Sequence, residues 1–280
     1  MNDRSIGTLL KDMIGEDVGL GDLTSSFTPN PKVRAVIRSK DSGYVSGIDE
    51  LQALFKQYNV KSNPMVSDGD RVSKDMVVFR LYGNAHDILL IERTALNILS
   101  RMSGITTLTR KYVDALNSVK SRARVTATRK TTPLIRCLEK KAVVVGGGLT
   151  HRMGLYDMVL IKDNHLILFD NDVERALSAA SNARLKAKVE VEVSNRADAL
   201  KAAESGADVI MLDNMRPREI RKILSDLEVR GLRRKVLIEV SGGIRLRNIR
   251  NYGRLDVDWI SIGRLTHSAV ALDFSMDFTG

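Results

Sequence analysis

The amino-acid sequence predicts an α/β protein whose second half is a parallel β/α barrel. Six short apolar segments follow one another along that half, and helix-like stretches separate most of them. Each segment ends in polar, charged or glycine residues, as in barrels whose chemistry takes place where the strands end. The six segments are Arg124–Thr128, Met158–Ile161, Val189–Val193, Val209–Leu212, Val236–Val240 and Trp259–Ile262.

The first hundred residues do not repeat this rhythm and predict a mixed α/β domain. Lys32–Ser39 alternates as a half-buried strand does, and Met76–Tyr82 predicts another strand. Apolar residues at helical spacing predict helices over Gly47–Tyr58 and Ala85–Met102. We expect the second of these helices to end at Gly104, because glycine is common just past a helix C-terminus.

These elements suggest two domains. The mixed α/β domain covers residues 1–104, and the barrel covers residues 105–265. Residues 266–280 are too few for another β/α unit, so we expect them to pack back on the first domain.

Composition narrows the function classes. The net charge is +10 over 280 residues, but aromatic residues are only 5%, so a stacking platform for nucleic acid is not expected. No apolar run is long enough to cross a membrane, and no signal segment is recognisable. The single cysteine, Cys137, excludes an internal disulfide framework and predicts a cytoplasmic protein.

Basic residues gather at the ends of two predicted strands and in the loop between them. Arg129 and Lys130 follow the first barrel strand, and Lys162 follows the second. His151 and Arg152 follow three consecutive glycines, which allow a backbone to approach a ligand closely. Arginine and lysine together suit carboxylates and phosphates, so these residues predict an anionic substrate.

Two carboxylates interrupt a valine strand. Glu190 and Glu192 lie on one face of that strand because side chains alternate, and Asp213 ends the next strand. Glu192 is nearer the strand's carboxyl end and is the better candidate for ligand contact. Glu192 and Asp213 predict a magnesium site that keeps its waters and uses substrate oxygens, or else a Lys–Glu network without metal.

Glycines follow the last two strands. Barrel enzymes often bind phosphate with backbone amides of these two loops. Ser241, Gly242 and Gly243 follow one strand and Gly263 follows the other, with His267 close behind. We therefore predict a phosphate site there.

Several long motifs, in order and nearly end to end, resemble the quinolinate phosphoribosyltransferase family. The matching segments are Glu16–Thr24, Glu92–Asn97, Ser103–Ile105, Thr128–Pro133, His151–Asp157, Ile161–His165, Glu190–Glu192, Leu212–Met215, Ser241–Ile244 and Ser261–Gly263.

The resemblance implies an N-terminal α/β sandwich domain followed by an incomplete parallel α/β barrel, in a homodimer with shared active sites. It implies a pentosyltransferase of NAD biosynthesis, which joins quinolinate to phosphoribosyl pyrophosphate with Mg²⁺. The products would be nicotinate mononucleotide, pyrophosphate and carbon dioxide.

The resemblance also implies a role for each site residue. Quinolinate would be bound by Arg129, His151, Arg152 and Lys162, and by Arg93 from the partner subunit. Lys130 would contact phosphoribosyl pyrophosphate, while Glu192 and Asp213 would hold the metal and the ribose hydroxyls. The 5′-phosphate would lie against Ser241, Gly242, Gly243 and Gly263, near His267.

Three positions depart from the family pattern and leave alternatives open. Ala127 stands where the family commonly has Asp, Leu134 where it has Gly, and Arg264 where it has a small residue. A sister branch found with molybdenum-transport proteins shares the first departure and is one alternative. A Schiff-base aldolase using Lys130 or Lys162 is a second, and a basic nucleic-acid-binding protein is a third.

Overall fold

The computed structural model describes residues 3–279, which form two compact units. The first unit contains the chain up to Arg110, the segment Cys137–Gly146 and the chain from Ser268 onward. The second unit contains Lys111–Arg136 and Gly147–His267. Segment 137–146, which we expected within the barrel, thus groups with the first unit.

Helix α4 (Arg136–Val145) shows why this segment groups with the first unit. Glu139 is fully buried, and its Oε1 accepts a hydrogen bond from Arg101 Nη2 at 2.7 Å. Lys141 Nζ lies 2.8 Å from Asp49 Oδ2 and 2.9 Å from Glu50 Oε1. Glu139 and Lys141 of α4 therefore find these partners in the first unit.

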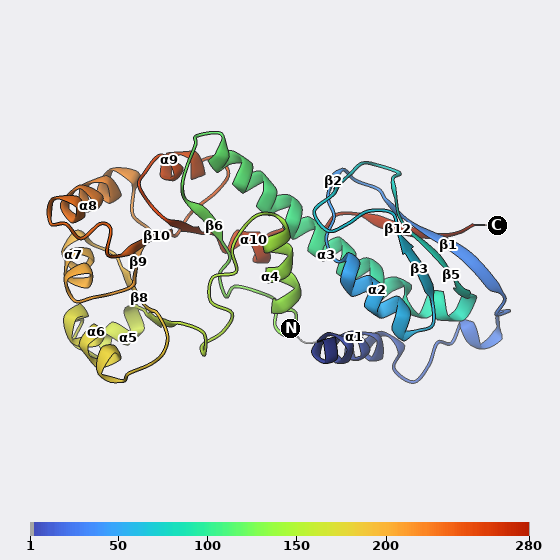
Figure 1. Cartoon of the computed structure of the whole chain (residues 1–280). Helices are drawn as coiled ribbons and strands as arrows, with labels where there is room; N and C mark the ends of the chain where they lie inside the picture. Colours follow the sequence, from blue (N-terminus) through green and yellow to red (C-terminus); the bar gives the residue numbers. More distant parts are fainter. Residues whose placement is uncertain (1–2, 280) are drawn as a thin grey trace. The chain divides into compact units, whose positions relative to one another are not determined.

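The first unit is built on an antiparallel sheet in the order β12-β1-β5-β3. Helices α2 and α3 lie on one face of it (Figure 1). Phe55 of α2 meets Phe79 of β5 edge to face, with 5.3 Å between ring centroids. The elements, with a small separate β2–β4 pair, are α1 (Asp3–Val18), η1 (Ser25–Phe27), β1 (Lys32–Ser39), β2 (Gly43–Tyr44), α2 (Ile48–Gln57), β3 (Lys61–Pro64), β4 (Arg71–Val72), β5 (Val77–Asn84), α3 (Ala85–Asn117, which belongs to the second unit from Lys111 onward) and β12 (Phe274–Thr279).

The expected end of the long helix at Gly104 is wrong. Helix α3 runs on to Asn117, so Gly104 lies in its interior. A Cβ atom at Gly104 would lie 2.2 Å from the carbonyl oxygen of Val270 and 2.9 Å from Cα of Ala271. Glycine is needed there because another backbone packs directly against the helix.

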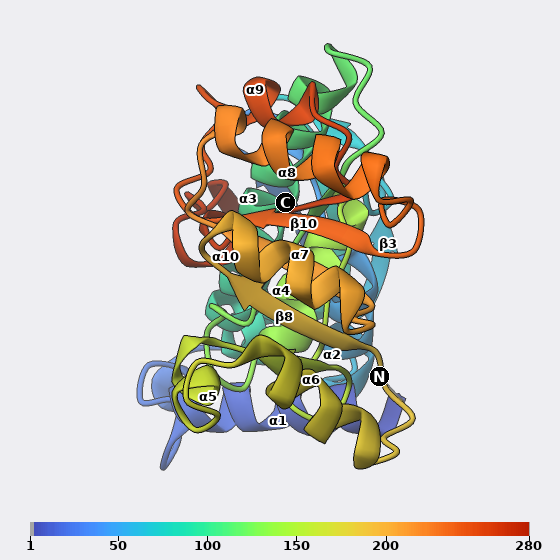
Figure 2. The same cartoon turned by 90° about the vertical axis from the view of Figure 1, so that its left-hand side faces the viewer.

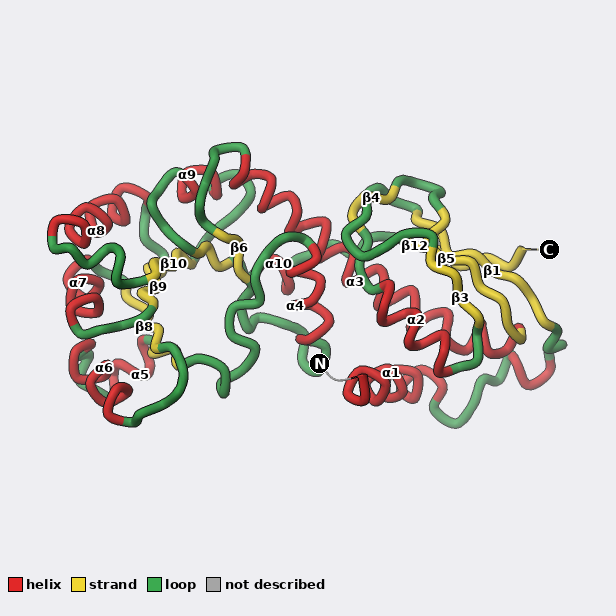
Figure 3. The backbone as a smooth tube through the Cα atoms, in the orientation of Figure 1, coloured by secondary structure: helices red, strands yellow, loops and turns green. Residues whose placement is uncertain are grey.

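The second unit is a six-stranded parallel sheet in the order β6-β11-β10-β9-β8-β7. Figure 3 shows its strands as an inner arc with helices outside. The elements are β6 (Arg124–Thr126), β7 (Val159–Ile161), α5 (Asp163–Ile167), α6 (Val173–Asn182), β8 (Val189–Val193), α7 (Arg196–Glu204), β9 (Val209–Asp213), α8 (Pro217–Val229), β10 (Leu237–Ser241), α9 (Ile249–Gly253), β11 (Trp259–Ser261) and α10 (Arg264–His267).

Helices α6, α7 and α8 cover the outer face of this sheet side by side (Figure 2). Strand β8 alternates as the sequence predicts: Val191 and Val193 are buried, and Glu190 is fully buried on the opposite face. Pro217 opens α8, and Glu219 accepts a hydrogen bond from the backbone N–H of Arg216 at 2.8 Å. None of the described helices is long and apolar enough to cross a membrane.

The barrel is incomplete, because no ladder joins its edge strands β6 and β7 within residues 3–279. The segment 147–158 runs between α4 and β7 without helix or regular strand. Its Leu149 forms a parallel bridge with Thr126 at the free edge of β6. The predicted fold class, an N-terminal α/β domain followed by an incomplete parallel α/β barrel, is confirmed.

Candidate active site

All six strands of the parallel sheet contribute to one pocket of about 450 Å³ at their carboxyl ends. This is the end at which barrel chemistry takes place. The pocket is lined by most of the residues predicted for the site. These are Arg129, Lys130, His151, Arg152, Lys162, Glu192, Asp213, Ser241, Gly242 and Gly243.

A larger hollow, of about 870 Å³, lies near the amino ends of β10 and β11. Its buried arginine, Arg233, already has partners: Nε lies 2.9 Å from Asp256 Oδ2, and Nη2 lies 2.9 Å from Asp258 Oδ2. Size alone would favour this hollow, but its one buried arginine is already paired, whereas the smaller pocket holds a buried arginine nitrogen without a partner. The smaller pocket is the better site.

Arg129 and Arg152 provide positive charge in the pocket, and Arg129 also has an unpaired donor. Arg129 Nε is buried and has no hydrogen-bond partner in the described structure. Arg152 is 8% exposed, and its Nη1 donates to the carbonyl oxygen of Met158 at 3.4 Å. Burial lowers the pKa of the Arg152 guanidinium, and the charge of Arg129 lowers it further. An anion bound in the pocket would offset the repulsion between the two arginines and accept a hydrogen bond from the unpaired Arg129 Nε.

Lys162 and Glu192 form an ion pair across neighbouring strands, with Nζ 2.5 Å from Oε2. Lys162 follows β7 directly, and Glu192 lies in β8, which pairs with β7 in parallel. The Glu192 side chain is 16% exposed and the Lys162 side chain is 42% exposed, so both reach the open pocket. Part of the Lys–Glu network that the sequence left open is therefore present.

Asp213 and the Ser241–Gly243 loop lie together because Asp213 pairs with Ser241 in the parallel register. The Asp213 carboxylate accepts a hydrogen bond from Asn214 Nδ2 at 2.6 Å. Gly242 has φ +87°, and a Cβ there would lie 2.2 Å from Asn214 Oδ1 and 2.7 Å from Asn214 N. No larger residue fits this turn, so the loop backbone packs directly against Asn214.

Lys130 lies against the loop after the last strand. A Cβ on Gly263 would lie 3.0 Å from Lys130 Cδ and 3.2 Å from His267 Nε2. Thr266 Oγ1 also donates to the Lys130 carbonyl oxygen at 2.7 Å. Gly263 and His267 do not line the pocket themselves, but Gly263 packs against both His267 and the lysine that does.

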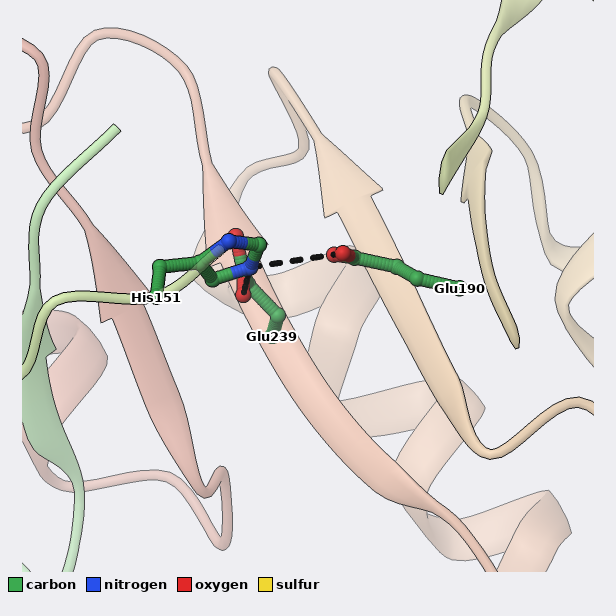
Figure 4. Close-up of side chains that lie close together, drawn as sticks. All are labelled: His151, Glu190 and Glu239. Carbon is green, nitrogen blue, oxygen red and sulfur yellow. Dashed lines mark hydrogen bonds and ion pairs between the residues drawn. The ribbon is translucent and has the colours of Figure 1, made fainter. Parts of the chain in front are cut away.

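Two buried carboxylates lie against the same ring nitrogen of His151 (Figure 4). Its Nε2 lies 2.9 Å from Glu239 Oε2 and 3.3 Å from Glu190 Oε2. Burial alone would lower the pKa of His151, but its contacts with the carboxylates of Glu190 and Glu239, and their charges, raise it to about 9. Burial, and then the charge of Glu239, raise the pKa of Glu190.

One predicted site residue is elsewhere, and one important residue was missed. Arg93 lies on α3 in the first unit and is not among the pocket-lining residues. Glu239 was not singled out, although it is a charged residue in an apolar strand as Glu190 is. The same period-two pattern that drew attention to Glu190 could have found it.

Comparisons with known proteins agree with this geometry. Residues 22–103 match the family "Quinolinate phosphoribosyl transferase, N-terminal domain", and residues 105–277 match the corresponding C-terminal domain.

Relatives match over nearly the full length. One is "Probable nicotinate-nucleotide pyrophosphorylase [carboxylating]" of Methanothermobacter thermautotrophicus, 41% identical over 97% of this chain and 98% of the relative. Another is the nicotinate-nucleotide pyrophosphorylase [carboxylating] of Rattus norvegicus, 36% identical over 97% and 90%. The crystal structure of NadC from Streptococcus pyogenes covers 100% of this chain and 99% of its own, with 35% identity and a TM-score of 0.91. The chain belongs to the quinolinate phosphoribosyltransferase family.

Proposed function

We propose that this chain transfers the phosphoribosyl group of phosphoribosyl pyrophosphate to quinolinate, with loss of carbon dioxide. The products are nicotinate mononucleotide and pyrophosphate, in NAD biosynthesis. The observation that carries the proposal is the pocket's unpaired, buried Arg129 Nε beside Arg152, in the same hollow as the Ser241–Gly243 loop. A dicarboxylate and a phosphate ester need such groups together.

Quinolinate would be bound by the basic side of the pocket. Arg129 and Arg152 offer forked donors, and Lys162 and His151 add positive charge. Because the two substrates are both anions, these cations offset the repulsion of bringing them together. Binding in one fixed orientation then places the ring nitrogen against ribose C1, which lowers the entropic part of the barrier.

The phosphoribosyl substrate would lie along the glycine loops and Lys130. Gly243 has φ +61°, and a Cβ there would have no neighbour within 4 Å, so its backbone faces open space. The 5′-phosphate is proposed to accept hydrogen bonds from this loop, with Ser241 and Gly263. Lys130 would contact the pyrophosphate, where negative charge builds up as the bond to C1 breaks.

Magnesium is proposed to bind at Glu192 and Asp213. Both carboxylates line the pocket and are neighbours in the β8–β9 part of the sheet, and oxygen donors suit this ion. Two protein carboxylates leave room for substrate oxygens, as magnesium sites at phosphates commonly do. When bound, the ion would supply charge stabilisation for the departing pyrophosphate. Glu190 is excluded from this role because it is fully buried against His151 and does not line the pocket.

After the transfer, the ring nitrogen is quaternary and can accept the electron pair released as the adjacent carboxylate leaves as carbon dioxide. Position and electric field are the chain's contributions to both steps. An aldolase is less well supported, because Lys162 is in an ion pair with Glu192 and a Schiff base needs a free amine.

A homodimer and a cytoplasmic location are also proposed. The family resemblance assigns the partner subunit's Arg93 to the site, and Arg93 of this chain does not line its own pocket. The single cysteine supports a reducing compartment. Light scattering of the purified protein would report the dimer, and an Arg93→Ala variant should raise the KM for quinolinate.

The function is tested by mixing the purified chain with quinolinate, phosphoribosyl pyrophosphate and magnesium, and following nicotinate mononucleotide and carbon dioxide together. Both products should appear, and only with metal. Product from nicotinate but not from quinolinate would keep the transfer and discard the decarboxylation. No product from either acid would favour the sister branch and draw attention to the buried Ala127 in the pocket wall.

A further inference from the structure

Glu190 and Glu239 are buried carboxylates to which the proposed reaction assigns no role. They come from β8 and β10, have no exposed surface, and point toward the same histidine (Figure 4). Both carboxylate oxygens of Glu190 and Oε1 of Glu239 have no hydrogen-bond partner in the described structure, so Glu190 is held only by its ion pair with His151. Burying two carboxylates this way costs several kcal/mol unless a positive charge stays beside them.

His151 is the group placed beside them, and its ring orientation is determined by its surroundings. Its backbone has φ +50°, a left-handed conformation that is costly for a residue with a side chain. The ring packs edge to face on Trp259, at 5.7 Å between centroids. Nε2 binds both carboxylates, whereas Nδ1 has no hydrogen-bond partner among the described residues.

The protonation state of this ring decides what Nδ1 can do. A neutral imidazole that donates from Nε2 to Glu239 has only a lone pair at Nδ1, and a lone pair repels a carboxylate. An imidazolium donates from both nitrogens. The carboxylate pair favours the imidazolium, as the raised pKa of His151 indicates.

The arginines near His151 are consistent with the imidazolium form of its ring. Arg152 is near enough to both carboxylates to interact with their charges, and Arg129 in turn interacts with Arg152. The imidazolium and the Arg152 guanidinium together match the two buried carboxylates. The positive charge on Arg129 then remains for a ligand.

We propose that Glu190 and Glu239 are positioning residues, which hold His151 as an imidazolium so that Nδ1–H donates to a carboxylate of the acid substrate. This inference rests on the proposed function. It assigns the carboxylates an indirect role in acid recognition, separate from the binding of the phosphoribosyl substrate at Glu192 and Asp213.

A metal ion is the competing occupant of the same cluster. One nitrogen of His151 and one oxygen from each carboxylate lie within 4.8 Å of one another, which is close enough for shared coordination. The direct hydrogen bond from Nε2 to Glu239 and the nearby charge of Arg152 favour a proton over a metal ion. Metal analysis of the purified protein distinguishes the two.

The first test is kinetic and uses Glu239→Gln and Glu190→Gln. Glutamine keeps the shape and can accept from Nε2–H, but it removes the charge that favours the imidazolium. Each variant should raise the KM for quinolinate about 10- to 100-fold, the worth of one charged hydrogen bond, and change the KM for phosphoribosyl pyrophosphate about twofold at most. Glu239→Asp should recover part of the loss.

Glu139→Gln is the matched control, because Glu139 is also fully buried and charge-paired, but lies in the first unit. It should lower stability and leave both KM values unchanged. An equal rise in both KM values in the Glu239 and Glu190 variants would show a general structural role and overturn the proposal.

The second test measures the protonation state of His151 by NMR and does not depend on activity. Its main reading is taken on the wild-type protein, so the test stands even if a variant folds poorly. The chain has four histidines, so ¹⁵N-labelled imidazole signals can be assigned with a His151→Asn variant. The proposal expects both His151 nitrogens to be protonated in the wild-type protein at pH 7.5, and one to be protonated in Glu239→Gln.

A neutral His151 in the wild-type protein, or a stoichiometric metal ion that Glu239→Gln loses, would overturn the inference. If the wild-type protein made no nicotinate mononucleotide, the proposed function would fail. A protonated ring that shifts in the variants would then still support the charge arrangement.

Discussion

Lys162 Nζ lies 2.5 Å from Glu192 Oε2, so the residue proposed to bind the acid and the residue proposed to bind the metal are directly paired. Both side chains reach the pocket, and each substrate would draw on one of them. In this arrangement, the ion pair holds both side chains at the pocket before either substrate arrives. When a substrate or metal ion binds to one of these residues, it replaces part of the existing ion pair. This exchange limits the net binding free energy that Lys162 or Glu192 contributes alone.

Removing the charge of Glu192 should weaken metal-dependent binding. We expect Glu192→Gln to lower the affinity for phosphoribosyl pyrophosphate about tenfold or more in magnesium, and to have little effect without it, because a neutral amide is a poorer ligand for a hard cation. Calorimetry with and without magnesium measures this. Exposed Glu228→Gln is the control. Unchanged affinity would move the metal role to another carboxylate.

Lys130→Ala should remove most turnover while leaving the fold intact. Lys130 follows β6 and packs over Gly263, and its charge is proposed to stabilise the departing pyrophosphate. Loss of about 10²- to 10³-fold in kcat is expected, with an unchanged circular dichroism spectrum. Lys235→Ala, an exposed lysine outside the pocket, should behave as wild type. Near-normal activity of Lys130→Ala would mean that the site has been misplaced.

Leu134→Gly should stabilise the protein slightly. Leu134 is 89% exposed and has φ +67°, a conformation that glycine adopts without penalty. Relief of about 1–2 kcal/mol of backbone strain is partly offset by about 0.5–1 kcal/mol of added freedom in the unfolded chain. Urea denaturation would show the net gain. A loss of stability would show that the exposed leucine makes a contact the backbone argument ignores.

Gly104→Ala should destabilise the first unit. A methyl group there would overlap the carbonyl oxygen of Val270, so either the helix or the C-terminal segment must shift, at a cost of about 1–3 kcal/mol or more. Gly15→Ala, in α1 with no atom within 4 Å of a new Cβ, should instead add up to about 1 kcal/mol. Thermal unfolding of both variants compares the two. Equal effects would contradict the close packing.

Stability should fall between about pH 7 and pH 9 through His151. Its folded pKa of about 9 exceeds the ordinary value of 6.5, so the contribution is complete below pH 6.5 and is lost as the pH rises through 9. The raised pKa of Glu190 acts in the same direction, because the folded state also holds this proton more tightly than the unfolded state does, but its loss of stability falls at lower pH, between the ordinary value of 4.5 and about 7. Urea unfolding at several pH values should show a drop that His151→Gln lacks. A drop of the same size in His151→Gln would assign it to other groups.

The sequence predicted the strands of the barrel well and the boundaries between units less well. A repeated apolar segment with a polar end is a local pattern, so β8 and β9 could be read directly from composition and spacing. The role of Gly104 depended on Val270, which is far away in the chain, and no local pattern contains that contact. Helix α4 likewise groups with the first unit because of the partners of Lys141, which are far away in the chain.

The site shows the same division. Arg129, Lys162 and Asp213 could be predicted because they stand where strands end. The pairing of His151 with Glu190 and Glu239 joins a loop to two strands that are not neighbours in the sheet, and it could not be read from spacing. The available signal in the sequence was a charged residue on an otherwise apolar strand, and Glu190 and Glu239 both show it.

The open edge between β6 and β7 has an evolutionary consequence. His151 and Arg152 stand on the segment 147–158, which is not part of the parallel ladder, whereas the carboxylates at the proposed metal site belong to β8 and β9. Outside Leu149, which bridges to Thr126, insertions or substitutions in that segment leave the strand pairing intact while they alter residues proposed to bind the acid. The acceptor half of the proposed site can therefore change in this fold while the carboxylates proposed to handle the sugar phosphate stay fixed in the sheet.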